Sequence, residues 1–583
     1  MTGVRVPACR TGRMVGLAVA GWLVHAGGAA AFPLLEPTNA DTGATATGGG
    51  GELAAPDAQD LRHQLQLANG LAAPPGGGWT IVPRLDVQEA LNDNVFQVHS
   101  PRRADLTTYI SPGIAIAGET SHLQLTVNYS PTLEMFMVNG SQNALTQQLN
   151  ATGLLTLIPD RLYVDLRAIA GVQATSGLLG GYGTLGSAGT AAVSLGGLNG
   201  VSGNGLGLTK SNRTQTMSAG ISPYVVGRLG SYGDYRIGAS LDVSHLDNAN
   251  GFAVLPLAGG GTSPQTLVTT QQVAHFSSGD YLTAFQDAVD VNFSQSNTTY
   301  EQGTNGAIGA ALLTGTNASQ SETASDQLTW HYDQAIALFA SLGWENIRYS
   351  GSNGLNVNDA TWSVGATLTP NPDSYLTVSY GHQQGADSLT VNAHYLATAR
   401  TVISANYGST VGTQLQNLQR QLDLATANGN GGLVNRQTGG PLFNSNNLLN
   451  VQPGVYRFNT LSLNTSTTLD RDNISLGVSY TQQSGVGSGQ FSGTSTTGGT
   501  ATAQWIHSLT PVMTLSGALS YSRQDYAGGG GLVQSVSASA VLQYILSETL
   551  STSLRYVFSN QMSSVPSQSL YQDLLIAGFT KQF

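Results

Sequence analysis

The chain has 583 residues, of which only 9% are charged, whereas about 25% are charged in an ordinary soluble domain. Its formal net charge of −11 argues against a nucleic-acid partner, because domains that bind nucleic acids are basic. At 40% hydrophobic residues it is not composed like a disordered chain, and it lacks the Glu, Lys, Arg and Leu content of a helical bundle. What remains is a weakly charged chain with 73 glycines that favours β-structure.

The first 31 residues have the three-part layout of a secretory signal peptide. A positively charged start precedes an apolar stretch over 14–26, and small residues follow at 29–31, so we expect Sec-type export and cleavage after Ala31. The apolar stretch is shorter than the ~20 residues that a membrane-spanning helix needs. The next segment, 32–78, is rich in Ala, Gly and Pro, and we expect a mostly disordered periplasmic tail that is too short for the plug of a TonB-dependent receptor.

From Trp79 to the C-terminus the chain alternates between apolar and polar residues, which is typical of β-strands. Around 550–559, for example, Leu554, Tyr556 and Phe558 alternate with Ser553 and Arg555. The same alternation occurs at 122–129, 162–168, 235–243 and 474–480. A soluble antiparallel sandwich would also alternate, so this pattern alone does not decide between a sandwich and a membrane barrel.

The lengths of the connections favour the barrel. Short turns alternate with long loops rich in Gly, Ser and Asn, as in barrels with short periplasmic turns and long extracellular loops. The short turns lie at 159–161, 230–234, 369–374, 470–473, 509–511 and 546–549, and the long loops at 172–212, 298–320, 411–452 and 484–496. We therefore predict an all-β, transmembrane, antiparallel up-and-down β-barrel over residues 79–583, in the outer membrane of a Gram-negative bacterium. Turn spacing gives about 22 strands, or 18–22 because 247–300 is ambiguous.

The C-terminal strand carries the most specific pattern in the chain. Tyr571, Leu575, Ala577, Phe579 and Phe583 share one face, and the chain ends on an aromatic residue. This resembles the assembly signal of outer-membrane proteins, which implies recognition by the barrel assembly machinery through Phe579 and Phe583. Two polar residues on the same face, Asp573 and Lys581, depart from that signal.

Two groups of residues are candidates for the functional site. The first is expected to line the pore on the polar strand faces, either selecting solutes or forming ion pairs that brace the wall: Tyr163, Asp165, Arg167, Arg236, Asp242 and Arg555. The second, Leu415, Leu418 and Leu422, has helical spacing inside the loop 411–452. That helix would either constrict the barrel mouth or lie on its rim, and the sequence leaves both open.

Three segments resemble the putative β-barrel porin 2 family. Pro83–Val95 is similar to its first strand, Leu338–Tyr349 to a mid-barrel strand, and Leu415–Leu422 to its loop helix. The likeness covers roughly residues 79–583. It implies an outer-membrane barrel of a polysaccharide-producing bacterium, with a role in capsule or exopolysaccharide production and contact with polysaccharide export components.

No pattern for enzymatic chemistry occurs in the chain. None of the ten histidines lies in a zinc-helix motif, and the glycine runs lack the Lys-Ser/Thr of a phosphate loop. The single cysteine, Cys9, precedes the apolar stretch and leaves with the signal peptide. We expect no enzyme activity, cofactor or metal, and a barrel surrounded by outer-membrane lipid. The leading hypothesis is a passive water-filled pore; the alternatives are a structural barrel that scaffolds a polysaccharide export complex through its loops, and a soluble secreted β-protein.

Overall fold

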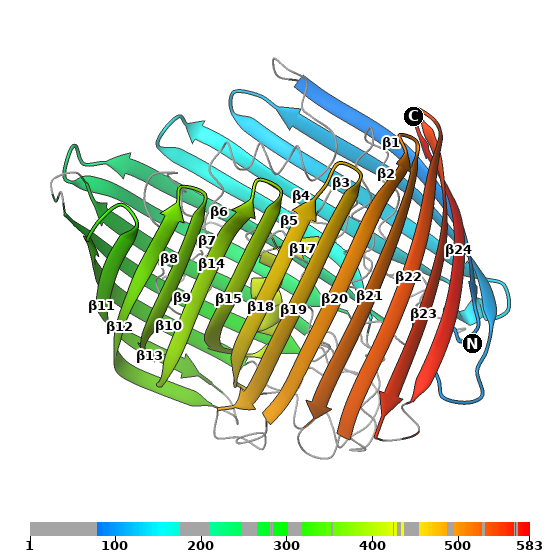
Figure 1. Ribbon diagram of the computed structural model, residues 1–583. Coiled ribbons are helices and arrows are strands. Elements are labelled where there is room, and N and C mark those ends of the chain that lie inside the picture. The colour runs from blue at the N-terminus through cyan, green and yellow to red at the C-terminus, as the bar shows by residue number, and fades with distance from the viewer. Residues whose placement is uncertain are drawn as a thin grey trace, which may run out of the picture.

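The protein forms one closed ring of 22 antiparallel strands (Figure 1). The computed structural model describes residues 78–174, 209–210, 213–247, 265–279, 282, 284–300, 317–350, 354–423, 425–427, 433–435, 454–486, 495–526, 531–564, 566 and 569–583. Each strand of the ring pairs with the next along the chain, and the last strand pairs with the first. This confirms the predicted antiparallel up-and-down barrel and its strand number. The expected signal peptide (1–31) and nearly all of the expected tail (32–78) lie outside the described residues.

The strands of the ring are mostly 12–17 residues long. They are β1 (Gly78–Asn92), β2 (Asp105–Glu119), β3 (Leu123–Phe136), β4 (Ala144–Ile158), β5 (Leu162–Ala174), β6 (Arg213–Arg228), β7 (Gly233–Leu246), β8 (Gln265–Ser278), β9 (Phe285–Tyr300), β10 (Asn317–His331), β11 (Ile336–Tyr349), β12 (Leu355–Asn371), β13 (Ser374–Gln383), β14 (Ala386–Thr398), β15 (Thr401–Gly412), β18 (Tyr456–Thr468), β19 (Asp472–Gly485), β20 (Ser495–Thr510), β21 (Met513–Tyr526), β22 (Gly531–Ser547), β23 (Leu550–Ser563) and β24 (Leu570–Gln582). Between β15 and β18 lie helix α4 (Gln414–Asp423) and a small hairpin of β16 (Ala425–Ala427) and β17 (Leu433–Asn435), and a 3-10 turn η1 (Gly140–Gln142) precedes β4.

The tight turns gather at one end of the ring, which we call the turn end, and the longer connections at the other, the loop end (Figure 1). One connection at the loop end is tight as well: Gln384 and Gly385 join β13 to β14 with φ of 52° and 70°. Two consecutive left-handed residues make the turn that matches the twist of a two-residue hairpin. Outer-membrane barrels keep short turns in the periplasm, so the predicted outer-membrane location would make the turn end the periplasmic end.

The two faces of the wall are inverted relative to a soluble protein. On β7, Ile237, Leu241 and Val243 are 55%, 38% and 37% exposed, whereas Ser240 and Asp242 are at most 1% exposed. Apolar side chains therefore point outward, where lipid covers them, and polar ones point into the lumen. No described helix is long and apolar enough to cross a membrane.

Glycines let long side chains cross the inner wall. Arg84 on β1 donates to Asn128 on β3 (3.0 Å) by passing over Gly113 on β2, where a Cβ would lie 2.6 Å from Arg84 Nε. Gly220 on β6 makes the same room between Arg167 and Asp242, because its Cβ would overlap Asp242 Oδ1 and lie 2.8 Å from Arg167 Nε. The missing Cβ thus allows an ion pair between strands that are not neighbours.

The crossing over β6 gives the first prediction. Gly220→Ala should lower the free energy of unfolding by about 1–3 kcal/mol, because overpacking forces both charged side chains to move. Gly517→Ala is the matched control, since a Cβ there meets no atom closer than 3.9 Å. Urea unfolding in lipid vesicles, followed by tryptophan fluorescence, measures both. Equal stability of the two variants would contradict the steric role of Gly220.

Candidate functional site

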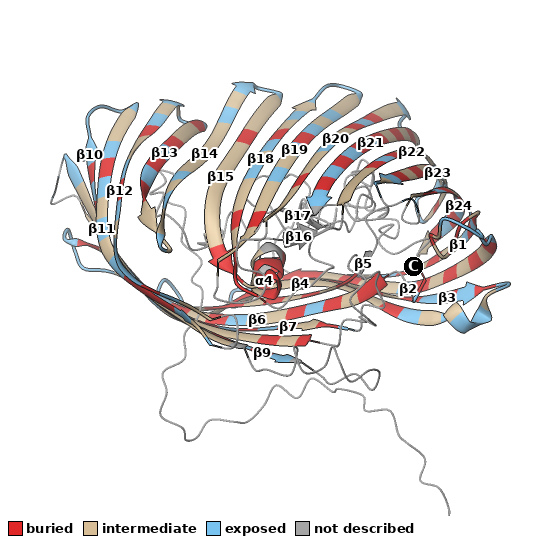
Figure 2. Cartoon of the chain, turned by 90° about the horizontal axis from the view of Figure 1, so that it is seen from below, coloured by how far each residue is buried: buried red, intermediate tan, exposed pale blue. Residues whose placement is uncertain are grey.

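Helix α4 lies inside the ring of strands (Figure 2). It begins with a reciprocal cap: Gln416 N donates to Thr413 Oγ1 (3.2 Å), and Thr413 N donates to Gln416 Oε1 (2.9 Å). This Thr-x-x-Gln arrangement is a capping box, which fixes the start of a helix. The helix lies inside the ring and contacts the loop-end parts of its strands, and its role as a constriction of the barrel mouth stays a prediction.

The leucines of α4 contact an apolar patch on the inner wall. Leu415, Leu418 and Leu422 are 3%, 6% and 5% exposed, and they form one cluster with three wall residues. Those residues, which we call the lumen patch, are Ile169 on β5, Leu246 on β7 and Leu267 on β8. Each stands at a lumen-facing position in a strand whose other lumen-facing residues are mostly polar. Burying the apolar face of the helix against the lumen patch holds α4 to this side of the barrel.

Polar contacts fasten α4 to β8 again and to two further strands, β10 and β11. Thr269 Oγ1 on β8 donates to Gln419 Oε1 (2.7 Å), and Gln416 Nε2 donates to Ser319 Oγ on β10 (2.7 Å). Tyr349 OH on β11 donates more weakly to Gln416 Oε1 (3.3 Å). The helix is thus fixed to the inner wall from β5 to β11.

Arg420 brings a positive charge into the lumen on α4. Its Nη1 donates to the Val411 carbonyl oxygen at 3.4 Å. Burial lowers the pKa of this guanidinium below its usual value, but an arginine stays charged in a protein.

Four of the predicted pore-lining residues lie together on β5 and β7. Arg167 Nη2 contacts Asp242 Oδ1 at 2.7 Å, and both side chains are at most 6% exposed. Ser240 Oγ donates to the other carboxylate oxygen of Asp242 (2.6 Å). Asp165 and Arg236 are buried as well, at 8% and 3% exposure. Of the two interpretations left open by the sequence, bracing of the wall fits the Arg167–Asp242 pair.

Tyr163 belongs to a stack near the turn end. Its ring stacks on Tyr224 of β6 with centroids 5.4 Å apart, and the Arg236 guanidinium lies 4.1 Å from the centre of the Tyr224 ring. Arg555 is not part of this group, because it lies on β23, where it pairs in register with Val541 and Ile576. Sequence reasoning found these side chains one by one but not their grouping.

Other lumen contacts were not predicted. Arg213 on β6 donates to Glu134 on β3 at 2.5 Å, and His275 on β8 contacts Asp290 on β9 at 2.6 Å. Glu134, His275 and Asp290 have as their only sequence signal a position on the polar side of an alternating strand. Arg213 lacks even that signal, because it is in phase with the outward-facing Met217 on β6. The lumen patch had a clearer signal, namely an apolar residue such as Ile169 in phase with Asp165 and Arg167. Among the described residues, no group of three His, Cys, Asp or Glu could hold a metal ion.

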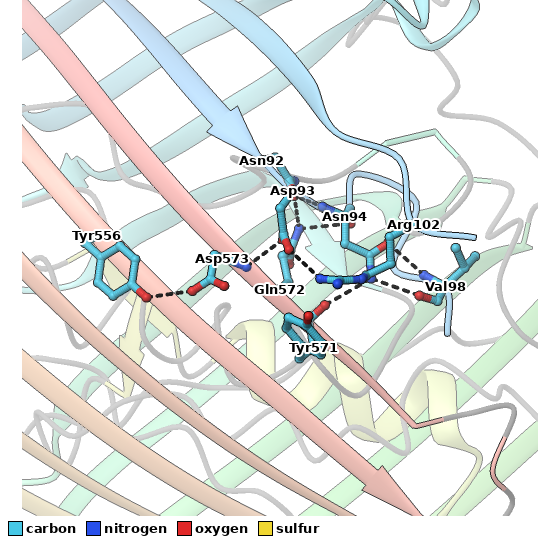
Figure 3. A network of polar contacts seen from close by, with 9 residues as sticks. All are labelled: Asn92, Asp93, Asn94, Val98, Arg102, Tyr556, Tyr571, Gln572 and Asp573. Atoms are coloured by element: carbon cyan, nitrogen blue, oxygen red, sulfur yellow. Dashed lines mark hydrogen bonds and ion pairs between the residues drawn. The ribbon is translucent and has the colours of Figure 1, made fainter. Parts of the chain in front are cut away.

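The C-terminal strand closes the ring against β1, and its polar residue Asp573 is satisfied there (Figure 3). Tyr556 OH donates to Asp573 Oδ1 (2.6 Å), and the Asp573 amide donates to Asp93 Oδ1 (2.8 Å). Arg102 pairs with Asp93 (2.7 Å) and lies over the ring of Tyr571. The first loop therefore fastens the loop end of this closing seam.

The other exception in the C-terminal pattern, Lys581, donates to Thr549 Oγ1 at 2.6 Å in the last turn. Phe579 and Phe583 are 56% and 71% exposed on the outer face, where an aromatic signal would be read. Their role in assembly stays a prediction.

Removing one partner of the buried pair gives the second prediction. Arg167→Met should lower the free energy of unfolding by about 3–5 kcal/mol, because Asp242 would keep an uncompensated buried charge. Arg228→Met is the control: its pair with Asp234 (2.9 Å) is 72% and 48% exposed, and we expect a loss of about 1 kcal/mol or less. Urea titration of both variants measures the difference, and equal losses would show that the buried pair does not brace the wall.

Comparison with solved structures identifies similar barrels. The FrpB iron transporter from Neisseria meningitidis (F5-1 variant, apoprotein form) superposes with a TM-score of 0.50 at 10% identity, over 93% of this chain and 86% of that chain. The siderophore receptor PirA from Acinetobacter baumannii gives 0.45 at 11% identity, over 86% and 80%. At this identity the likeness to FrpB is one of fold alone. No curated protein matches the sequence significantly.

The family comparison agrees with the resemblance seen in the sequence. Together with the closed barrel and its apolar outer face, the match to a porin family supports an outer-membrane location. Residues 479–583, which include β20 to β24, match the family described as putative beta-barrel porin 2.

Proposed function

We propose that the protein is a porin-like passive pore of the outer membrane. The observation that carries this proposal is the closed ring of 22 strands with a polar inner face. Barrels of about 16–18 strands already leave an aqueous channel, so a ring of this size has room for water unless its lumen is filled. Transport through such a pore would follow the concentration gradient of the solute.

Helix α4 sets the width of this pore. It is fixed to the wall from β5 to β11 by the lumen patch and by the bonds of Gln416 and Gln419. Exclusion by size therefore depends on a helix that is docked, and not only on the strand number. The charge of Arg420 would make the narrowed part more favourable for anions than a neutral helix would.

The inner face of the wall from β19 to β22 favours the passage of a neutral, hydroxyl-rich solute. Its inner face carries Ser, Thr and Gln, and hydroxyl pairs such as Ser520–Ser537 (2.7 Å) connect the strands. Side chains of this kind exchange hydrogen bonds readily with sugar hydroxyls. We therefore propose passage of oligosaccharide segments, in keeping with the role in exopolysaccharide production that the family resemblance implies. A scaffold for an export complex has no specific contact in its favour among the described residues.

Undocking α4 tests the pore and its constriction together. In planar lipid bilayers the purified barrel should give stepwise ion conductance. The triple variant Leu415→Ser, Leu418→Ser, Leu422→Ser should raise the single-channel conductance on the order of twofold, because the cross-section held by the helix opens to ions. Asn417→Ser, on the same helix but outside the leucine face, should leave the conductance unchanged.

Three outcomes separate the claims. A folded wild type without conductance steps would refute the pore. Steps of equal size in the wild type and the triple variant would refute narrowing by α4 while leaving the pore intact. Addition of a neutral oligosaccharide should reduce the ion current transiently, and an unaltered current would refute the proposed solute class.

A further inference from the structure

Backbone pairing between β14 and β15 ends before either strand does. The last pair towards the loop end is Val391 with Tyr407, and beyond it β15 continues with β18 alone up to Gly412. On its side, β14 continues with β13 alone as far as the tight turn at Gln384 and Gly385. The tip of the β13–β14 hairpin and the end of β15 are therefore neighbours in the ring that no backbone pairing joins.

The Gln384 side chain takes the place of that pairing at Val411. A regular continuation of the register would put Val411 opposite Asp387. Instead, the Val411 amide donates to Gln384 Oε1 at 2.6 Å. Val411 is 5% exposed, so its backbone groups are shielded from water and need partners in the protein. The Gln384 carboxamide is thus a direct bond from the hairpin to β15.

Two other strands hold the tip of the hairpin in place. Arg457 Nη2 on β18 donates to the Gln384 carbonyl oxygen at 2.7 Å. The Gly385 amide donates to Glu345 Oε1 on β11 at 3.1 Å, and Glu345 is only 2% exposed. Because the tip is bonded from both sides, it is a fixed point from which Gln384 can place Val411.

The position of Val411 determines where α4 begins. Val411 lies two residues before Thr413, whose reciprocal cap with Gln416 starts the helix. The Val411 carbonyl oxygen accepts from Arg420 Nη1 (3.4 Å), and Arg420 folds back over Gly412, where a Cβ would lie 3.0 Å from its Nη2. A displacement of Val411 would therefore move the first turn of α4 with it.

Gln384 is an unusual residue for its place in the turn. Its φ of 52° is left-handed, and a two-residue turn of this kind favours Asn or Gly at its first position. Strained residues of this sort persist where their surroundings hold them, and they gather at functional sites. An asparagine would suit the turn, but its amide is one methylene shorter and would not reach the Val411 amide. Glutamine at this position therefore fits the contact with β15 better than it fits the turn.

We propose that Gln384 is the positioning residue of the pore constriction, because it fixes the start of α4 from the hairpin. The leucine face alone resists sliding of the helix poorly, since apolar contacts are not directional. A hydrogen bond to the Val411 amide is directional and sets the helix end in one place. The effect on pore width rests on the proposed function, whereas the effect on the helix does not.

Hydrogen–deuterium exchange measured by mass spectrometry on the barrel in lipid nanodiscs tests this role. Gln384→Asn and Gln384→Gly both suit the turn but lose the bond to Val411. Exchange of the amides 411–418 should rise on the order of fivefold in both variants, as expected for one lost hydrogen bond. The hairpin amides 377–382 should not exchange faster, because the turn itself is favoured.

Gln383→Asn is the matched control, since the Gln383 side chain bonds to no residue in the described part of the chain. It should leave exchange over 411–418 as in the wild type. Heat-modifiable migration in gels confirms that each variant is folded.

Two exchange results would overturn the proposal. Unchanged exchange over 411–418 in both Gln384 variants would show that Gln384 does not position α4. An equal rise in the hairpin amides, or an equal rise over 411–418 in Gln383→Asn, would show that Gln384 only stabilises the hairpin.

Single-channel recording then tests the link to pore width. Steps of the Gln384→Asn barrel should be larger or more variable than those of the wild type, and identical steps despite a loosened helix would overturn this link. A wild type without steps would refute the proposed pore, whereas the exchange result would still decide whether Gln384 positions α4.

Discussion

The structure depends on one constraint: inside a bilayer no water is present to bond a free backbone N–H or C=O group. Each such group costs several kcal/mol, so a sheet that crosses lipid must close on itself. In this chain the constraint is met by pairing β24 with β1, and Asn94 and Gln572 reinforce the seam at its loop end. Asn94 Nδ2 donates to the Tyr571 carbonyl oxygen (3.0 Å), and Gln572 Nε2 donates to Asn92 Oδ1 (2.8 Å). The network in Figure 3 thus lies where closure is completed.

Closure also explains the composition. A ring around a wet lumen has no large apolar core to fill, so Ser, Thr, Asn and Gln occupy the inner positions and few charges are needed. The charges that are present, such as Arg167 and Asp242, pair within the wall. Some described residues depart from the inversion of faces. Apolar side chains point inward at Ile169, Leu246 and Leu267, and again in a cluster at the closing seam formed by Ala90, Tyr109, Val557, Leu574 and Ile576. Polar side chains point outward at Gln147, Gln215 and Asp573. The patch of Ile169, Leu246 and Leu267 receives α4.

The sequence predicts most of this fold because its signals are local. Alternation with a period of two and the short turns give the strand number, and the leucine spacing at 415, 418 and 422 predicts a helix. What it does not predict is where that helix lies, because the lumen patch comes from three strands that only the closed ring brings together. The same limit applies to Tyr163 and Arg236, which meet through Tyr224, and to Arg555, which has the same pattern but lies far from them in the ring.

The unpredicted features share a physical cause. Gln384 contacts Val411 only because β15 leaves β14, and no local pattern shows where pairing between two strands ends. Gly220 likewise reads as an ordinary strand glycine until register places it between Arg167 and Asp242.

Spin-label accessibility along β19 tests the inversion of faces most directly. Labels placed one at a time from Ile474 to Thr481 in lipid vesicles are exposed to oxygen, which concentrates in lipid, and to a water-soluble nickel complex. The barrel predicts that oxygen accessibility peaks at Ile474, Leu476, Val478 and Tyr480, and that nickel accessibility peaks at the residues between them. If both reagents peaked at the same residues, or oxygen showed no maximum at the apolar ones, those side chains would not face lipid and the barrel account would be contradicted.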